Sequence, residues 1–138
     1  MGTIISHLGR HPTNRQKVAN IGPEKGREAI SNYRAIKYFI DASANRISLL
    51  EFDIKTGRTH QIRVHASDMG NPIIGDMVYG SKNSIKISTS HGVSRQLLHA
   101  KSLTFYLPGE TVARTFEAPL PEDYCNFLDK LRTIDEID

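Results

Sequence analysis

The chain has 138 residues, of which 38 % are hydrophobic and 24 % charged, a composition typical of one globular domain with a single core. It contains no apolar run of the ~18 residues that a membrane span requires, and its N-terminus lacks the layout of a signal peptide. We therefore expect a cytoplasmic protein with no membrane partner. Residues 1–27 hold five basic side chains and one acidic one, whereas residues 117–138 hold seven acidic and two basic ones. A basic body favours a polyanionic partner, although an ordinary solvated surface explains the charge equally well.

Residues 1–27 are rich in glycine, proline, asparagine and basic side chains, which predicts a basic N-terminal arm or loop. Such an arm either contacts a phosphate backbone or is a piece of a larger domain. We assign the folded part of the chain to residues 28–138.

Two hairpins are predicted from alternating and β-branched patterns. Ser31–Ile40 and Asn45–Lys55 form the first, with residues 41–44 as its turn. Residues 103–107 alternate as a third strand, and residues 112–118 return as a fourth.

The period changes after the first hairpin. Ile62, Ala66 and Met69 recur at helical spacing, so they predict one buried helix face. Thr59 is a good capping residue and Gly70 a good stop, and the first turn of this helix would offer free backbone N–H groups.

The C-terminal part of the chain predicts a loop and a second helix. Residues 81–95 are polar and predict a surface loop, and residues 97–100 form a short apolar segment of uncertain type. Pro121 suits the first position of a helix that packs on the sheet. The order of hairpin, helix, hairpin and helix predicts an α+β domain with a mixed, mainly antiparallel sheet and flanking helices.

The segment TGRTHQIRVH, residues 56–65, concentrates two arginines and two histidines between a strand and a helix. This pattern is typical of a site that meets an anion. A metal site is the first alternative, with His60, His65 and His99 as candidate ligands, but no cysteine or carboxylate lies at a helpful spacing, and we expect no metal. No nucleophile elbow for a hydrolase and no glycine loop for a free nucleotide occurs, so the phosphate of a nucleic acid is favoured.

TGRTHQIRVH, together with the segment NPIIGDMVYG at residues 71–80, closely resembles the C-terminal signature of the RluA-type pseudouridine synthases. Further matches to that family, in its order, are Gly2-Thr3-Ile4, Gly9-Arg10-His11-Pro12, Arg15, Glu28-Ala29 with Tyr33, Leu97-Leu98-His99-Ala100 and Phe116-Glu117-Ala118-Pro119.

The resemblance implies an enzyme that isomerises uridine in ribosomal or transfer RNA without a metal or organic cofactor, acting on a flipped base. It implies that an aspartate is the essential catalytic group and that Arg63 is its partner. It also implies residues that brace the cleft or contact RNA, namely Arg58, Thr59, His60, Gln61 and His65. The basic residues of the arm that we expect to contact RNA are Arg10, Arg15 and Lys17.

The family's aspartate belongs to an Arg-Leu-Asp-x-x-Thr-Ser-Gly segment that these 138 residues do not contain. Asp53, Asp68 and Asp76 match other parts of the pattern, so none inherits its role. We therefore expect the C-terminal half of a catalytic domain that is inactive alone, with the other half as a possible separate partner chain. The alternatives are a non-catalytic RNA-binding module and a residual fragment without a function of its own.

Overall fold

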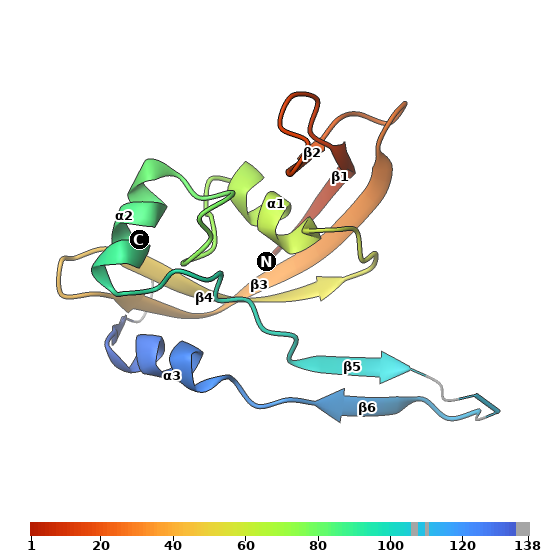
Figure 1. Ribbon diagram of the computed structural model, residues 1–138. Coiled ribbons are helices and arrows are strands. Elements are labelled where there is room, and N and C mark those ends of the chain that lie inside the picture. The colour runs from red at the N-terminus through yellow and green to blue at the C-terminus, as the bar shows by residue number, and fades with distance from the viewer. Residues whose placement is uncertain (106–107, 110, 135–138) are drawn as a thin grey trace.

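One antiparallel sheet organises the molecule. The structure, a computed structural model, describes residues 1–105, 108–109 and 111–134. The strands of the main sheet are β1 (Gly2–Arg10), β2 (Val18–Asn20), β3 (Arg27–Ile40), β4 (Arg46–Ile54) and β7 (Arg132–Ile134). They run in the order β2-β1-β3-β4, and β7 pairs with the end of β3 (Figure 1). Every pairing between described strands is antiparallel, so the predicted α+β class with a mainly antiparallel sheet is confirmed.

The first predicted hairpin is confirmed as β3 and β4. Its turn is fixed by Asp41, whose carboxylate accepts hydrogen bonds from the backbone amides of Ser43 and Asn45 at 2.9 and 2.8 Å. A register shift between Ala35 and Lys37 divides the long strand β3 into two parts. The N-terminal part pairs with β1 and the C-terminal part with β7.

The prediction of an N-terminal arm over residues 1–27 is wrong, because residues 2–10 form β1 between β2 and β3. Ser6 pairs with Ala29, and both are buried, as is Leu8. In this strand a buried position is taken by a serine, Ser6, where an alternating pattern would need an apolar residue. Ser6 and its partner Ala29 on β3 lie 23 positions apart, so local composition gave no sign of this pairing.

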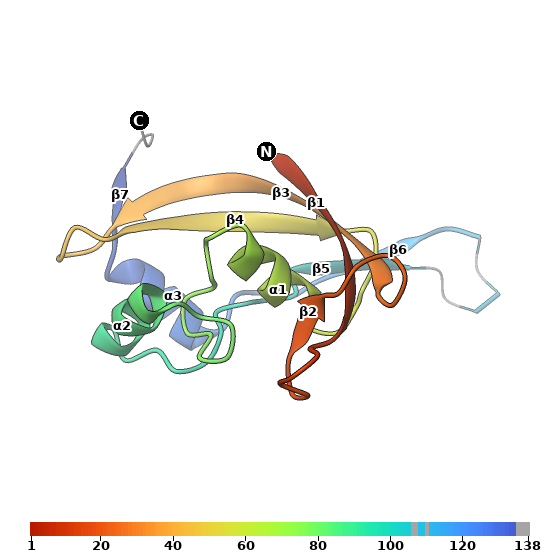
Figure 2. The same ribbon diagram turned by 90° about the horizontal axis from the view of Figure 1, so that it is seen from above.

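Three helices accompany the sheet: α1 (Gln61–Asp68), α2 (Lys82–Ser90) and α3 (Glu122–Asp129). In Figure 2 all three lie on one side of the ribbons of β3 and β4. None of the described helices is long and apolar enough to cross a membrane.

The surface loop predicted for residues 81–95 is wrong, because most of it is helix α2. Ser81 and Ser84 form a reciprocal capping box, in which each side chain accepts a hydrogen bond from the other's backbone amide. Ile87 and Ser88 then lie buried on the inner face. The spacing of the two serines is a start signal that composition alone concealed.

The second predicted hairpin is confirmed for the described residues as β5 (Ser102–Phe105) and β6 (Arg114–Glu117). It forms a separate two-stranded sheet that extends away from the helices in Figure 1. Leu107, which the prediction included in the third strand, lies outside the described residues. The predicted C-terminal helix is confirmed as α3, with Pro121 as its N-cap, whereas β7 was not predicted.

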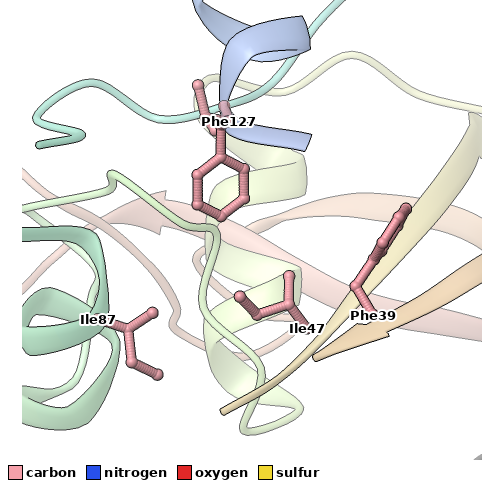
Figure 3. Close-up of a cluster of buried hydrophobic side chains, with 5 residues drawn as sticks. Phe39, Ile47, Ile87 and Phe127 are labelled. Atoms are coloured by element: carbon pink, nitrogen blue, oxygen red, sulfur yellow. The ribbon is translucent and has the colours of Figure 1, made fainter. Parts of the chain in front are cut away.

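Two apolar clusters hold these elements together. The first joins the sheet to α2 and α3 through buried residues of five segments, four of which are labelled in Figure 3. These are Phe39, Ile47, Ile87, Leu97 and Phe127. The second cluster consists of Leu8, Ala29, Val64 and Tyr79, and it anchors α1 to β1 and β3. The candidate site is built over the second cluster.

Candidate functional site

The junction between β4 and α1 is held by the side chain of Gln61, which is only 3 % exposed. Its Oε1 accepts hydrogen bonds from Thr56 Oγ1 at 2.8 Å and from the Arg58 amide at 3.0 Å. Its Nε2 donates to the Ile30 carbonyl and to Ser31 Oγ, both at 2.9 Å. All of these groups belong to the protein, so of the two roles predicted for Gln61, bracing the cleft fits these contacts and a direct contact with RNA does not. Its role is to fix the path of the chain into α1.

His60, and not Thr59, is the N-cap of α1. Its backbone has φ 55° and ψ 21°, and its side chain does not cap the helix. A left-handed conformation costs an L-residue about 1 to 2 kcal/mol, so the surrounding contacts must hold it in place. The expected free amides of the first turn are also partly used, because the Gln61 amide donates to the Arg58 carbonyl at 3.0 Å.

His65 braces α1 from inside and is fully buried. Its Nε2 lies 2.6 Å from Ser6 Oγ and its Nδ1 lies 2.8 Å from Ser31 Oγ. Burial lowers the pKa of His65, so the imidazole is neutral near pH 7. Of the two roles predicted for His65, bracing the cleft fits this burial and a direct contact with RNA does not, because its two ring nitrogens are occupied by hydroxyl groups of the sheet.

The buried face of α1 also differs from the predicted one. It consists of Gln61, Val64, His65 and Ala66 instead of the stripe through Ile62 and Met69. Polar side chains can face the sheet here because strand hydroxyls satisfy their hydrogen bonds. A hydrophobic period cannot identify such a face.

Arg63 has a carboxylate partner inside the chain. Its Nε lies 2.8 Å from Asp76 Oδ2 and its Nη2 lies 2.9 Å from Asp76 Oδ1, which makes a bidentate pair. The side chain of Asp76 is fully buried and that of Arg63 is 12 % exposed. Sequence reasoning gave Arg63 a partner outside these residues and missed this one.

The pair is also stabilised electrostatically. Burial alone would raise the pKa of Asp76, but the hydrogen bonds from Arg63 and from the amides of Val78 and Tyr79 outweigh it, so the pKa lies below its ordinary value. The hydrogen bonds with Asp76 in turn raise the pKa of Arg63. Both groups are therefore charged throughout the neutral range.

One nitrogen of Arg63 remains available. Among the described residues, none hydrogen-bonds to Nη1, and no buried side-chain nitrogen or oxygen lacks a partner. Nη1 must therefore reach the surface. The structure does not test the predicted contact between Arg63 and an aspartate outside these residues. Nη1 is a donor that remains free for such a contact.

Gly75 brings Asp76 to this position. Its φ of +87° lies in the left-handed region, and a Cβ there would collide with the Arg95 carbonyl. Its amide donates to Ser88 Oγ at 2.8 Å, which ties the turn to α2. In the sequence, the sign of this role is a glycine directly before an aspartate, a pair typical of turns in which the carboxylate accepts hydrogen bonds from the following amides.

Tyr79 is the second residue that sequence reasoning missed. Its ring lies 5.0 Å from the guanidinium carbon of Arg63 and 5.4 Å from Lys17 Nζ. Its hydroxyl accepts a hydrogen bond from the Val18 amide at 2.9 Å and lies 2.8 Å from His60 Nδ1. One buried side chain thus joins the start of β2, the start of α1 and the Arg63–Asp76 pair.

Most of the predicted RNA-contacting residues converge on one open groove of about 320 Å³, called here the basic groove. Its polar and charged lining residues are Arg10, Arg15, Gln16, Lys17, Arg27, Arg58, Thr59 and His60. No acidic side chain lines it among the described residues. The structure therefore brings together six of the eight predicted residues and excludes Gln61 and His65.

Arg58 is anchored for this position, since its Nε donates to the Glu28 carbonyl at 2.9 Å. A second hollow of about 850 Å³ shares Arg10 and Arg15 with the basic groove and adds His11 and Lys25. Five arginines and lysines of the basic groove and one more in the second hollow form an extended positive surface. Such a surface fits a polyanion better than a single small anion.

Comparison with known proteins places the sequence. Residues 2–68 match the family model described as RNA pseudouridylate synthase. The chain is 40 % identical to the ribosomal large subunit pseudouridine synthase D of Pseudomonas aeruginosa, over 95 % of this chain and 41 % of that protein. It is 35 % identical to the protein of the same name from Escherichia coli, over 95 % of this chain and 40 % of that protein.

A solved structure supports the fold. The chain superimposes on human RNA pseudouridylate synthase domain containing 1 with a TM-score of 0.77 and 22 % identity, covering 99 % of this chain and 55 % of the human one. The chain spans about two fifths of the length of the bacterial relatives it matches. It belongs to the RNA pseudouridine synthase family, of whose members it corresponds to a part.

Proposed function

We propose that this chain is the RNA-binding and arginine-bearing half of a catalytic domain that isomerises uridine to pseudouridine in ribosomal RNA. The printed names of its bacterial relatives support this substrate, because they are synthases of the large ribosomal subunit. The reaction breaks and remakes a glycosidic bond within one nucleotide. We expect it to need no metal and no organic cofactor.

The observation that carries the proposal is the link between the basic groove and the Arg63–Asp76 pair. Arg63 and Lys17 contact the same tyrosine ring. Arg63 itself does not line the groove, but the Tyr79 ring links it to Lys17, which does, and we propose that an RNA backbone in the groove passes near this ring. That is the arrangement needed to bring a flipped uridine to a catalytic centre.

Arg63 is proposed to serve two carboxylates. Asp76 holds Nε and Nη2 and so fixes the plane of the guanidinium. Nη1 is the donor that we assign to the catalytic aspartate, which it would keep ionised and oriented. Asp76 itself is fully buried and paired, so it is unsuited to attack a nucleotide.

The catalytic aspartate must come from a segment outside these 138 residues. That segment belongs either to the same polypeptide or to a separate chain that assembles with this one. We expect the 138-residue chain alone to bind RNA and to leave uridine unchanged.

The test joins this chain to the part of the Pseudomonas aeruginosa relative that precedes the matched region. The joined protein is assayed for release of tritium from C5 of uridine in ribosomal RNA. We expect release by the joined protein and none by the chain alone. A well-folded joined protein that binds RNA and releases no tritium would overturn the proposal.

Two variants of the joined protein examine Arg63. Arg63→Lys keeps a charge but cannot make the bidentate pair, so we expect isomerisation to fall at least 100-fold with RNA affinity within about twofold. Arg46→Lys, an exposed arginine on β4, is the matched control and should change neither quantity. Equal losses of affinity and activity in Arg63→Lys would place Arg63 on the RNA backbone instead.

A non-catalytic RNA-binding module is the second candidate function. The observation that favours it is that the basic groove is formed entirely by residues of this chain. Salt-dependent RNA binding without tritium release by any correctly folded joined protein would select this candidate.

A further inference from the structure

The tautomer of His60 follows from the contacts of the Tyr79 hydroxyl. The phenol oxygen already accepts a hydrogen bond from the Val18 amide. If His60 Nδ1 also donated to it, the phenol proton would have no acceptor among the described residues, although Tyr79 is only 6 % exposed. Leaving a buried donor unsatisfied costs about 1 to 3 kcal/mol. The arrangement that satisfies all three groups has Tyr79 O–H donating to His60 Nδ1.

A neutral imidazole that accepts at Nδ1 carries its proton on Nε2. None of the described residues accepts a hydrogen bond from Nε2, and no buried side-chain nitrogen among them lacks a partner. Nε2 therefore reaches the surface, and His60 lines the basic groove. The N–H bond at Nε2 is thus a donor without a partner in a groove suited to an anion.

We propose that Tyr79 is a positioning residue of the basic groove: its hydroxyl holds His60 as a neutral imidazole whose Nε2–H donates to an oxygen of bound RNA. The ligand part of this inference rests on the proposed function, whereas the tautomer does not. His60 has a left-handed backbone, and its Nδ1 lies 2.8 Å from the Tyr79 hydroxyl.

The charged surroundings favour the neutral form. Burial and the nearby guanidinium of Arg63 lower the pKa of His60, and Asp76 opposes this only in part. The remaining titratable groups around the imidazole are the phenol of Tyr79, which is the hydrogen-bond partner, and the groove cations Arg10, Arg15, Lys17, Arg27 and Arg58. A positive charge on His60 would face these cations without a free carboxylate to balance it.

The same contacts explain why a tyrosine suits this position. The ring packs in the second apolar cluster and contacts Lys17, Arg63 and the edge of the His60 ring, while only the hydroxyl makes a hydrogen bond with His60. Tyr79→Phe therefore removes the hydrogen bonds and keeps the packing and both cation contacts. Tyr33→Phe is the matched control, because the Tyr33 ring packs on Phe52 and its hydroxyl makes no hydrogen bond among the described residues.

The first measurement is the protonation state of His60 in the 138-residue chain, by long-range ¹H–¹⁵N NMR of the imidazole, assigned with His60→Gln. We expect the Nε2–H tautomer at pH 7 in the wild type and in Tyr33→Phe. In Tyr79→Phe we expect a mixture of both tautomers and a His60 titration that moves to higher pH. A wild-type Nδ1–H tautomer, or a titration unchanged by Tyr79→Phe, would overturn the positioning role.

The second measurement is RNA affinity against pH between 5.5 and 8. We expect the affinity of the wild type to change less than twofold through the His60 titration range. Tyr79→Phe should bind RNA about fivefold more weakly at pH 7, and its affinity should recover as His60 gains a proton. His60→Gln, which retains an N–H at the equivalent place, should bind RNA better than His60→Ala. Equal binding by those two variants would overturn the donor role.

The two measurements distinguish failure of the proposed function from failure of this inference. If the wild type shows the expected tautomer but binds no RNA, the proposed function and the donor role both fall and the positioning of His60 stands. If RNA binds and the tautomer is wrong, the proposed function stands and the inference falls.

Discussion

Two arginine–aspartate pairs in this molecule have almost the same geometry and very different surroundings. Arg63 and Asp76 are joined through Nε and Nη2 at 2.8 and 2.9 Å, and Arg95 and Asp123 through the same nitrogens at 2.6 and 2.8 Å. The side chains of the first pair are 12 % and 0 % exposed, whereas those of the second are 48 % and 53 % exposed. Distance alone would give both pairs the same weight.

Burial decides what each pair does. Exposed pairs contribute little, because water screens the charges and the side chains lose freedom. A buried pair is costly to break, because the remaining charge is left without a partner. The Arg63–Asp76 pair therefore fixes a rigid guanidinium beside the basic groove. The Arg95–Asp123 pair only connects the segment after α2 to α3.

The largest effect should come from breaking the buried pair. We expect Arg63→Ala to lower the free energy of unfolding by about 3 to 5 kcal/mol, because it leaves the Asp76 carboxylate uncompensated. Denaturant unfolding of the 138-residue chain measures this. The double variant Arg63→Met with Asp76→Leu removes both charges and should recover much of the loss. A cost for Arg63→Ala below about 1 kcal/mol would show that the pair behaves like an exposed one.

The second effect is a pH dependence of the free energy of unfolding that comes from the buried histidine of α1. Burial lowers the pKa of His65 in the folded state, so below the ordinary value of 6.5 the unfolded chain binds the proton more readily. The stability that comes from His65 should therefore be full above pH 6.5 and fall as the pH drops towards 5, by at most about 1.4 kcal/mol per pH unit. His60, whose pKa is also lowered, adds a slope of the same sign.

Unfolding free energies measured at intervals between pH 7.5 and 5 test this. His65→Gln should show a smaller slope than the wild type. Asp123→Asn is the control and should keep the wild-type slope, because the hydrogen bond from Arg95 holds the pKa of Asp123 below its ordinary value of 3.8. A wild-type stability that is flat over this range would contradict the neutral, buried state of His65.

The smallest effect should come from the exposed pair. Arg95→Ala removes a contact that is as short as the one in the buried pair, yet we expect the unfolding midpoint to stay within experimental error. The measurement is the same denaturant titration used for Arg63→Ala. A loss comparable to that of Arg63→Ala would mean that burial is not what separates the two pairs.

The sequence predicted the elements with strong periodicity and missed those whose partners are distant. The hairpin of β3 and β4 and the helix α3 have clear alternating or helical patterns. β1 has a buried serine where a pattern needs an apolar residue, and α2 has only two buried residues beyond its capping serine. Their burial depends on contacts with remote segments, which no local pattern contains.

The same limit applies to the site. Arg58, Thr59 and His60 were identified as a candidate surface from their chemistry, and the structure places them in one groove with the three basic residues of the N-terminal segment. Gln61 and His65 have the same chemistry, but strand hydroxyl and carbonyl groups bind them inside the protein. Only the fold tells which polar side chain faces solvent. Asp76 was missed because its partner lies thirteen positions earlier and its own setting is that of an ordinary turn.

The most direct test of the account is the salt dependence of RNA binding by the 138-residue chain. Arg58→Ala combined with Lys17→Ala removes two groove cations and is compared with a matched control, Lys86→Ala combined with Arg46→Ala, which removes two exposed cations away from the groove. We predict weaker binding for the groove variant and a slope of log affinity against log salt that is smaller by roughly 0.7 for each lost phosphate contact, with no change in the control. Identical affinities and slopes for the two variants would contradict the assignment of the basic groove to RNA.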